Sequence, residues 1–277
     1  MGEKDAEIDY VTINRCLWND KVDYHVRSTM YNVSGFLNGD DSLNQIEREL
    51  LGDLHNKRIL HLQCHFGLDS LSLIRHGAAH VTGVDLSDRA IQKAQELAQL
   101  IHHENSTRFI CCNIYDLETK LSCNDEDLFD IVFTSYGTIT WLPDVEGWAS
   151  IISRYLKLDG KFIMVEFHPV LWMFDKNFRI IEESYFNRRP IVEQCEGTYA
   201  DRSAPISNPS VAWNHTLSDI IQSLIKHHLR IDLFQEFDYS PYDCFHDTVR
   251  TNEGFYQIKG LENKLPMIYS LKATRIG

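Results

Sequence analysis

The stretch that decides the fold is residues 59–85, ILHLQCHFGLDSLSLIRHGAAHVTGVD. It begins with the short apolar run 59–62, which is typical of a buried strand, and it closes with a second such run, 80–84, directly before Asp85. Between the two runs, residues 69–76 have the spacing of a helix. A strand, a turn, a helix and another strand predict one unit of a parallel sheet with a right-handed crossover.

The same alternation continues along the chain. Further strands are predicted over 108–112, 130–134, 161–167, 229–237 and 266–274, and further helices over 43–51, 145–157 and 217–228, with a long helix capped by Ser87. Short connections between strands and helices predict a parallel sheet covered by helices on both faces. Ligands of such sheets bind beyond the carboxyl ends of the strands, so we expect the functional residues to follow the first four strands.

Composition divides the chain into three regions and limits its partners. We expect residues 1–44 to form an N-terminal cap segment, residues 45–167 and 217–277 to form the core, and residues 168–216 to form an inserted lid over the acceptor. The lid is rich in aromatic side chains, namely Trp172, Phe174, Tyr185, Phe186, Tyr199 and Trp213. With 27 basic and 40 acidic residues the net charge is −13, which disfavours nucleic acid and favours a small molecule as the partner.

Location and metal binding are also constrained by the sequence. No stretch approaches the roughly 18 consecutive apolar residues of a membrane helix, and the first ten residues lack the apolar run of a secretory signal. The seven cysteines contain no CxxC pair, so no metal site is predicted. We expect free thiols and a cytoplasmic protein.

Two features of the residues point to a nucleoside cofactor. Gly67 lies in the turn between a strand and a helix, where backbone N–H groups can bind an anionic group. Asp85 follows the second strand, where a carboxylate can accept hydrogen bonds from both hydroxyls of a ribose. A nicotinamide cofactor would need GxGxxG for its pyrophosphate, and only Gly67 is present. This favours S-adenosylmethionine, which has a ribose and no phosphate.

Five motifs in order carry a resemblance to a known family. The first is Ile59–Gly67, which aligns with the family's common first motif, V-L-D-L-G-C-G-x-G. The others are Val84–Ser87 at the end of the second strand, Cys112–Leu117 after the third strand, where the family binds adenine, Phe129–Phe133 with Trp141–Asp144 at the fourth strand, and Tyr155–Phe162 before the fifth strand. With these motifs the chain resembles the class I S-adenosylmethionine-dependent methyltransferases, and HLQCHFGLDSLSL is similar to a largely uncharacterised bacterial subgroup. The resemblance implies a Rossmann-like, seven-stranded, mostly parallel sheet with helices on both faces and an antiparallel last strand.

The resemblance also implies a set of cofactor-binding residues. They are Tyr31, Gln63, Cys64, His65, Gly67, Asp85, Leu86, Ser87, Asn113, Ile114, Ser135 and Tyr136. The chain departs from the family at His61, which replaces an acid, and at Gln63 and His65, which replace glycines. Either the loop has relaxed, or the side chains of Gln63 and His65 make contacts that glycine could not make.

The expected reaction is in-line methyl transfer to an unidentified small-molecule acceptor. His215, His168 and Tyr136 are the candidate catalytic residues, with a histidine as general base at the mouth of the pocket. His25, Ser28 and Tyr31 would share a face of a helix that closes over the cofactor. One alternative is a catalytically silent protein that binds S-adenosylmethionine or a partner, and another is a nicotinamide oxidoreductase.

Overall fold

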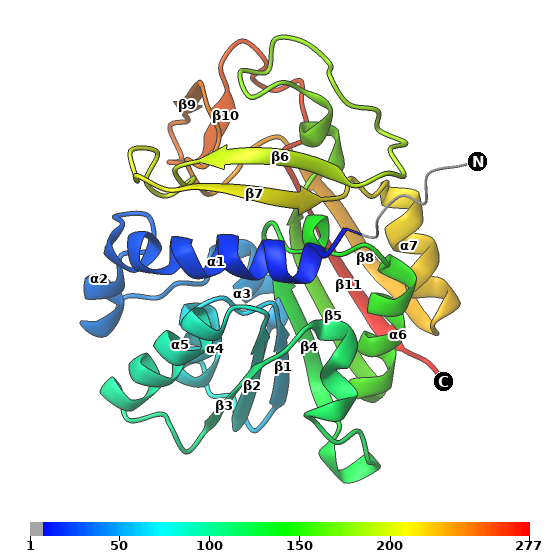
Figure 1. The fold of residues 1–277 in the computed structure, drawn as a ribbon. Coiled ribbons are helices and arrows are strands. Elements are labelled where there is room, and N and C mark those ends of the chain that lie inside the picture. Colours follow the sequence, from blue (N-terminus) through cyan, green and yellow to red (C-terminus); the bar gives the residue numbers. More distant parts are fainter. Residues whose placement is uncertain (1–7) are drawn as a thin grey trace.

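Seven strands form one sheet at the centre of the computed structural model, which describes residues 8–277 (Figure 1). In spatial order they are β3 (Thr107–Cys111), β2 (His80–Asp85), β1 (Arg58–Leu62), β4 (Phe129–Ser135), β5 (Leu156–Phe167), β11 (Ile268–Arg275) and β8 (Leu229–Phe237). The first five strands pair in parallel, whereas β11 is antiparallel to both of its neighbours. This confirms the predicted Rossmann-like sheet with an antiparallel last strand.

Strand β5 differs most from its predicted bounds. It begins at Leu156 rather than at residue 161, because Leu156 pairs with Phe129 of β4 before the register shifts and Ile131 pairs with Lys161. The extra residues bulge at Asp159, whose φ is 63°. The carboxyl end of β5 lies at Phe167, as predicted, and this end is the one that faces the site.

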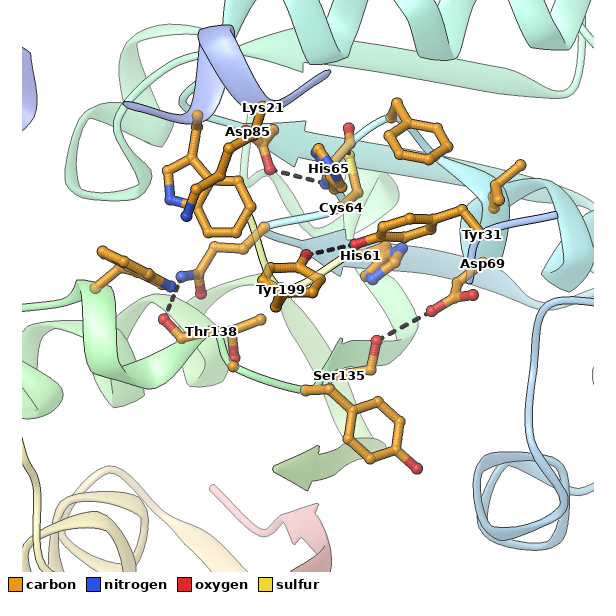
Figure 2. Close-up of a pocket in the computed structure, with 18 of the residues that line it drawn as sticks. Lys21, Tyr31, His61, Cys64, His65, Asp69, Asp85, Ser135, Thr138 and Tyr199 are labelled. Atoms are coloured by element: carbon orange, nitrogen blue, oxygen red, sulfur yellow. Dashed lines mark hydrogen bonds between the residues drawn. The ribbon is translucent and has the colours of Figure 1, made fainter. Parts of the chain in front are cut away.

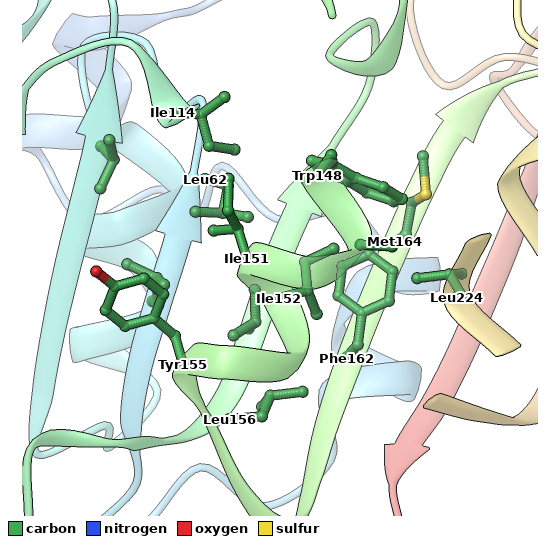
Figure 3. Close-up of a cluster of buried hydrophobic side chains, with 14 of the residues drawn as sticks. Leu62, Ile114, Trp148, Ile151, Ile152, Tyr155, Leu156, Phe162, Met164 and Leu224 are labelled. Carbon is green, nitrogen blue, oxygen red and sulfur yellow. The ribbon is translucent and has the colours of Figure 1, made fainter. Parts of the chain in front are cut away.

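Helices cover both faces of the sheet. On one face, α6 (Val145–Tyr155) and α7 (Leu217–Lys226) place Trp148, Ile152 and Leu224 against the strands (Figure 3). On the other face lie α3 (Gln45–Leu51), α4 (Leu68–Arg75) and α5 (Asp88–Leu100). Alternate strand residues face the two layers: Leu60 and Leu62 point toward α6, whereas Ile59 packs with α3 and α4.

An N-terminal helix that the sequence did not predict with defined bounds lies across the carboxyl ends of the strands. This helix, α1 (Tyr10–Arg27), runs between the sheet and the hairpin of β6 (Ile191–Glu196) and β7 (Ser207–Ala212) (Figure 1). The buried amide of Asn14 joins α1 to β7 through both backbone groups of Val211, at 2.8 and 3.0 Å. A short α2 (Val33–Leu37) follows.

Smaller elements complete the molecule. They are η1 (Ile114–Thr119), η2 (Asp125–Asp127), η3 (Ile139–Trp141), η4 (Pro169–Met173), β9 (Thr248–Arg250) and β10 (Tyr256–Ile258). No helix within residues 8–277 is both long and apolar enough to cross a membrane. The first seven residues, on which the expectation about a secretory signal partly rests, lie outside the described part.

Candidate functional site

One cavity of about 570 Å³ opens at the carboxyl ends of β1 to β4 and lies beneath α1. This volume is within the range of small-ligand sites. Every predicted cofactor-binding residue except Ser87 lines it: Tyr31, Gln63, Cys64, His65, Gly67, Asp85, Leu86, Asn113, Ile114, Ser135 and Tyr136. Residues that are distant in the sequence are therefore brought to one place.

Asp85 is fixed at the end of β2 by two backbone donors. Its Oδ2 accepts the N–H of His65 at 2.8 Å, and its Oδ1 accepts the N–H of Ser87 at 2.9 Å (Figure 2). Burial raises the pKa of Asp85 to about 6, and the backbone donors act in the opposite direction. Each carboxylate oxygen keeps a further lone pair for a ligand hydroxyl.

The loop after β1 retains the backbone that glycines would favour. Gln63, His65 and Gly67 have φ values of 55°, 51° and 81°. A side chain in this left-handed region costs about 1–2 kcal/mol. Gln63 Nε2 donates to the Thr138 carbonyl at 2.7 Å, and His65 Nε2 lies 2.8 Å from His25 Nδ1. The loop has not relaxed, and both side chains make contacts that glycine could not make.

Gly67 itself cannot carry a side chain without movement. An added Cβ would lie 2.9 Å from Ala94 Cβ on α5 and 2.9 Å from Phe109 Cε1 on β3. Real Cβ atoms do not tolerate such distances to packed neighbours. Close packing at Gly67 therefore fixes the start of α4 beneath the cavity.

Neutral aromatic rings surround His65. The ring of His25 stacks on Tyr31 at 5.1 Å, and the hydroxyls of Tyr31 and Tyr199 are hydrogen-bonded (Figure 2). Trp18 meets His65 edge-on at 5.4 Å. Burial lowers the pKa of His65 to about 3, and burial likewise lowers the pKa of His25. These two imidazoles are therefore uncharged at neutral pH, and they join the loop to the N-terminal segment.

Lys21 is a buried cation that faces the cavity. The residue is 6% exposed, and its Nζ lies 4.7 Å from the Trp18 ring centroid and 5.7 Å from that of Trp141. Burial lowers its pKa to about 8. Among residues 8–277, no other lysine or arginine lines the cavity. An anionic group of a ligand would complete this environment.

A carboxylate near the end of β5 fixes the turn that follows β4. Glu166 is buried and accepts the backbone N–H groups of Thr138 at 2.7 Å and Ile139 at 3.1 Å, together with that of Gly137. These bonds fix the turn that presents Tyr136 and Gly137 to the cavity. Glu166 thus positions the loop rather than a ligand.

The end of the cavity near β3 is mostly apolar. Ile114 and Leu86 line it, and Asn113 Oδ1 caps η1 by accepting the N–H of Tyr115 at 3.3 Å. The Nδ2 of Asn113 faces the Tyr10 hydroxyl at 3.5 Å. A flat heterocycle beside apolar side chains and one amide is the kind of group that such a surface can hold.

Three predicted residues lie elsewhere and are corrected. Neither His215 nor His168 lines the cavity, so neither can act there as a base. His215 Nε2 donates to the Leu142 carbonyl at 2.6 Å, and His168 pairs with Glu236 at 2.9 Å. Ser87 caps α5 by accepting the N–H of Ala90 at 3.0 Å, and its hydroxyl donates to α1. Of the three candidate catalytic residues, Tyr136 alone lines the cavity.

The face predicted for the N-terminal segment also needs correction. His25 is on α1, which ends at Arg27, and Ser28 is its C-cap, so Tyr31 reaches the cavity from the turn that follows. Lys21 and Asp69 also line the cavity, and neither was among the predicted site residues. The spacing of Tyr10, Asn14, Trp18 and Lys21 at every third or fourth residue is the signal that would have indicated the cavity face of α1.

The comparison with known families bears directly on this cavity. Residues 59–160, which span β1 to the start of β5, match the family model of the methyltransferase domain. The matched residues include the loop after β1 and Asp85, which line the cavity.

The individual relatives of this chain are distant. An uncharacterised protein of Haemophilus influenzae is 23% identical over 93% of this chain and 99% of its own. A ubiquinone biosynthesis O-methyltransferase of Neisseria meningitidis is 27% identical over 39% of this chain and 43% of its own. Geranyl diphosphate C-methyltransferase from Streptomyces coelicolor superposes with a TM-score of 0.59 at 14% identity, over 98% of this chain and all of that one, which shows the shared fold alone.

Proposed function

We propose that the chain is an S-adenosylmethionine-dependent methyltransferase that acts on a small molecule enclosed in the cavity. Asp85 would bind the ribose of the donor. The observation that carries the proposal is the half-buried carboxylate of Asp85, which two backbone N–H groups hold at the cavity wall. Asn113 and Ile114 would hold the adenine, and the loop Gln63–Gly67 would hold the methionine end. Lys21 is suited to its carboxylate, because no anion of residues 8–277 pairs with this lysine.

When bound, the donor supplies an electrophilic methyl group on a sulfonium. The chain's own contribution is enclosure and orientation. Trp18 and Trp141 meet edge-on at 5.4 Å above the loop, and Tyr31 and Tyr199 bond across the cavity. Such a roof limits access of water and restricts the orientations of a ligand, which lowers the entropic part of the barrier.

No histidine of the described chain is placed to act as a base beside Tyr136. His61 lines the cavity, but its Nδ1 is 2.8 Å from the Ser70 hydroxyl, and burial lowers the pKa of His61 to about 3. An acceptor that reacts as a neutral nucleophile would need no base at all. We therefore assign the chain the role of positioning the acceptor and excluding water.

Calorimetric titration with S-adenosylhomocysteine tests the donor site. Asp85→Ala should weaken binding by about 1–3 kcal/mol, since the ribose hydroxyls lose a charged acceptor. Asp116→Ala is the matched control, because Asp116 is exposed on η1 and lies outside the cavity. Equal affinities of the Asp85→Ala variant and the parent protein would remove Asp85 from the donor site.

A second measurement separates an enzyme from a silent binding protein. Incubation with methyl-labelled S-adenosylmethionine and a small-molecule extract should transfer label to a product of low molecular mass. Binding of S-adenosylhomocysteine without any transfer across such extracts would favour the silent protein. Binding of NAD in place of S-adenosylhomocysteine would favour the oxidoreductase instead.

A further inference from the structure

Asp69, which lines one end of the cavity, and Glu47, which is buried beside that end, form a feature that the donor site does not use. We call Asp69, on α4, and Glu47, on α3, the acidic pocket. Asp69 lines the cavity, and its Oδ2 accepts the Ser135 hydroxyl at 3.1 Å (Figure 2). Glu47 Oε1 accepts the Asn44 amide at 3.1 Å. Both acids are thus held in place by neutral donors.

The acidic pocket contains no cation from the chain. Within residues 8–277 neither Asp69 nor Glu47 forms an ion pair. Burial, and after it the charge of Asp69, raises the pKa of Glu47 to about 7. Glu47 is 0% exposed, and its Oε2 completes no hydrogen bond. The hydroxyl of Tyr136 lies beside Glu47, and this neutral group supplies no positive charge to the carboxylate. Uncompensated buried carboxylates are costly, so this environment is suited to a cation.

Aromatic rings form the walls next to the acidic pocket. Tyr136 and Tyr242 meet at right angles with centroids 5.0 Å apart, and the Tyr242 hydroxyl accepts the Asn44 amide at 2.7 Å. Phe167 lies 5.8 Å from Tyr136 and 5.1 Å from Phe245. Aromatic faces attract cations and bury apolar groups, so they fit a ligand with a charged end and an apolar body.

Carboxylates outnumber cations around the cavity. Among residues 8–277, the carboxylates of Asp40, Asp41, Asp69 and Asp85 line it, and Lys21 is the one lysine or arginine that does so. This balance repels an acceptor that carries a carboxylate or a phosphate at the acidic end and attracts one that carries an amine. The acidic end borders Ser135 and Tyr136 after β4, whereas Asp85 lies at the end of β2.

We propose that the acidic pocket receives the protonated amino group of the acceptor, whose apolar body packs against Tyr136, Tyr242 and Phe167. The substrate class is therefore a small amine with an aromatic or aliphatic body. This inference rests on the proposed function, because it assumes that the donor occupies the Asp85 end. The donor also carries an alkylammonium group. The experiment therefore distinguishes binding of the acceptor's amino group from binding of the donor's amino group.

The test is a ligand-observed NMR titration with benzylamine, benzyl alcohol and benzoate on protein saturated with S-adenosylhomocysteine. Benzylamine should bind about tenfold more tightly than its neutral and anionic analogues, which a buried charge pair readily provides. Asp69→Asn and Glu47→Gln should each remove most of that preference. Glu49→Gln is the control, because Glu49 is exposed on the same helix, and it should change nothing.

The donor measurements distinguish the two sources of the amino group. If the acceptor uses the acidic pocket, Asp69→Asn leaves the affinity for S-adenosylhomocysteine within about threefold of the parent value. A loss of about tenfold for S-adenosylhomocysteine, with no loss for 5′-methylthioadenosine, would assign the pocket to the donor and overturn the proposal. Equal binding of the three benzyl probes, or no binding of benzylamine, would also overturn it. Failure of S-adenosylhomocysteine to bind the parent protein would instead refute the proposed function.

Discussion

At His65, one substitution shows whether backbone strain or side-chain contacts have the larger effect on the stability of the protein. Its φ of 51° is in the left-handed region, where a side chain costs about 1–2 kcal/mol. Its Nε2 lies 2.8 Å from His25 Nδ1, and its ring packs against Phe66 at 4.5 Å and Trp18 at 5.4 Å. His65→Gly removes the strain and these contacts together. The sign of the stability change shows which effect is larger.

The contacts should be the larger effect. Losing the ring leaves the buried His25 nitrogen without its partner, at a cost of about 1–3 kcal/mol, and each lost aromatic contact adds about 0.5–1.5 kcal/mol. Relief of the strain is largely offset by the greater freedom of glycine in the unfolded chain, since each effect is about 1 kcal/mol. We expect the free energy of unfolding to fall by about 2–4 kcal/mol, and Tm by roughly 5–10 °C.

Thermal denaturation followed by circular dichroism measures this change. His65→Asn is the matched variant, because asparagine tolerates the left-handed region while it removes the ring. Its Tm should fall about as far as that of the glycine variant. A glycine variant with a Tm at or above that of the parent protein would refute the reasoning. It would mean that the contacts of the His65 ring do not outweigh its backbone strain.

Three further predictions concern packing, charge and the corrected histidine. Gly67→Ala should lower the free energy of unfolding by about 2–4 kcal/mol, because the new Cβ would clash with packed side chains and the backbone there is left-handed. Gly39→Ala is the control, since Gly39 also has a positive φ but has no such neighbours. Equal losses of Tm in the two variants would contradict the packing argument. Burial raises the pKa of Asp85 to about 6, so calorimetric affinity for cationic S-adenosylmethionine should rise between pH 5 and pH 7 as this group loses its proton. A flat profile over that interval would argue against Asp85 facing the donor. His215→Asn should leave the affinity for S-adenosylhomocysteine unchanged, because His215 lies outside the cavity, and a clear loss in the same titration would return it to the site.

Most of the sheet could be predicted from the sequence, because each of its first four strands is a short apolar run between turns. The predicted run 80–84 directly before Asp85 became β2, His80–Asp85, and the carboxyl ends of the strands located the cavity. The amphipathic pattern that reveals α6 and α7 is weak in α1, whose buried face includes Asn14, Lys21 and His25. Because the face of α1 that covers the cavity carries polar residues, hydrophobic periodicity does not indicate this helix.

The site was partly predictable for a related reason. Residues within a local motif, such as Asp85 after β2, reach the cavity because the motif itself fixes their position. His215 and His168 were chosen for their chemistry and for their place near a strand or helix end, and local packing turns both away. Glu47 was missed because only the docking of α3 brings it beside Tyr136, and no local pattern reports that contact.

A crystal structure of the protein with S-adenosylhomocysteine tests the central claim most directly. The account predicts the two ribose hydroxyls within hydrogen-bonding distance of the Asp85 carboxylate, the adenine beside Asn113 and Ile114, and the amino-acid end at the loop Gln63–Gly67. A ligand bound elsewhere at saturating concentration, or one in this cavity with its ribose away from Asp85, would contradict it.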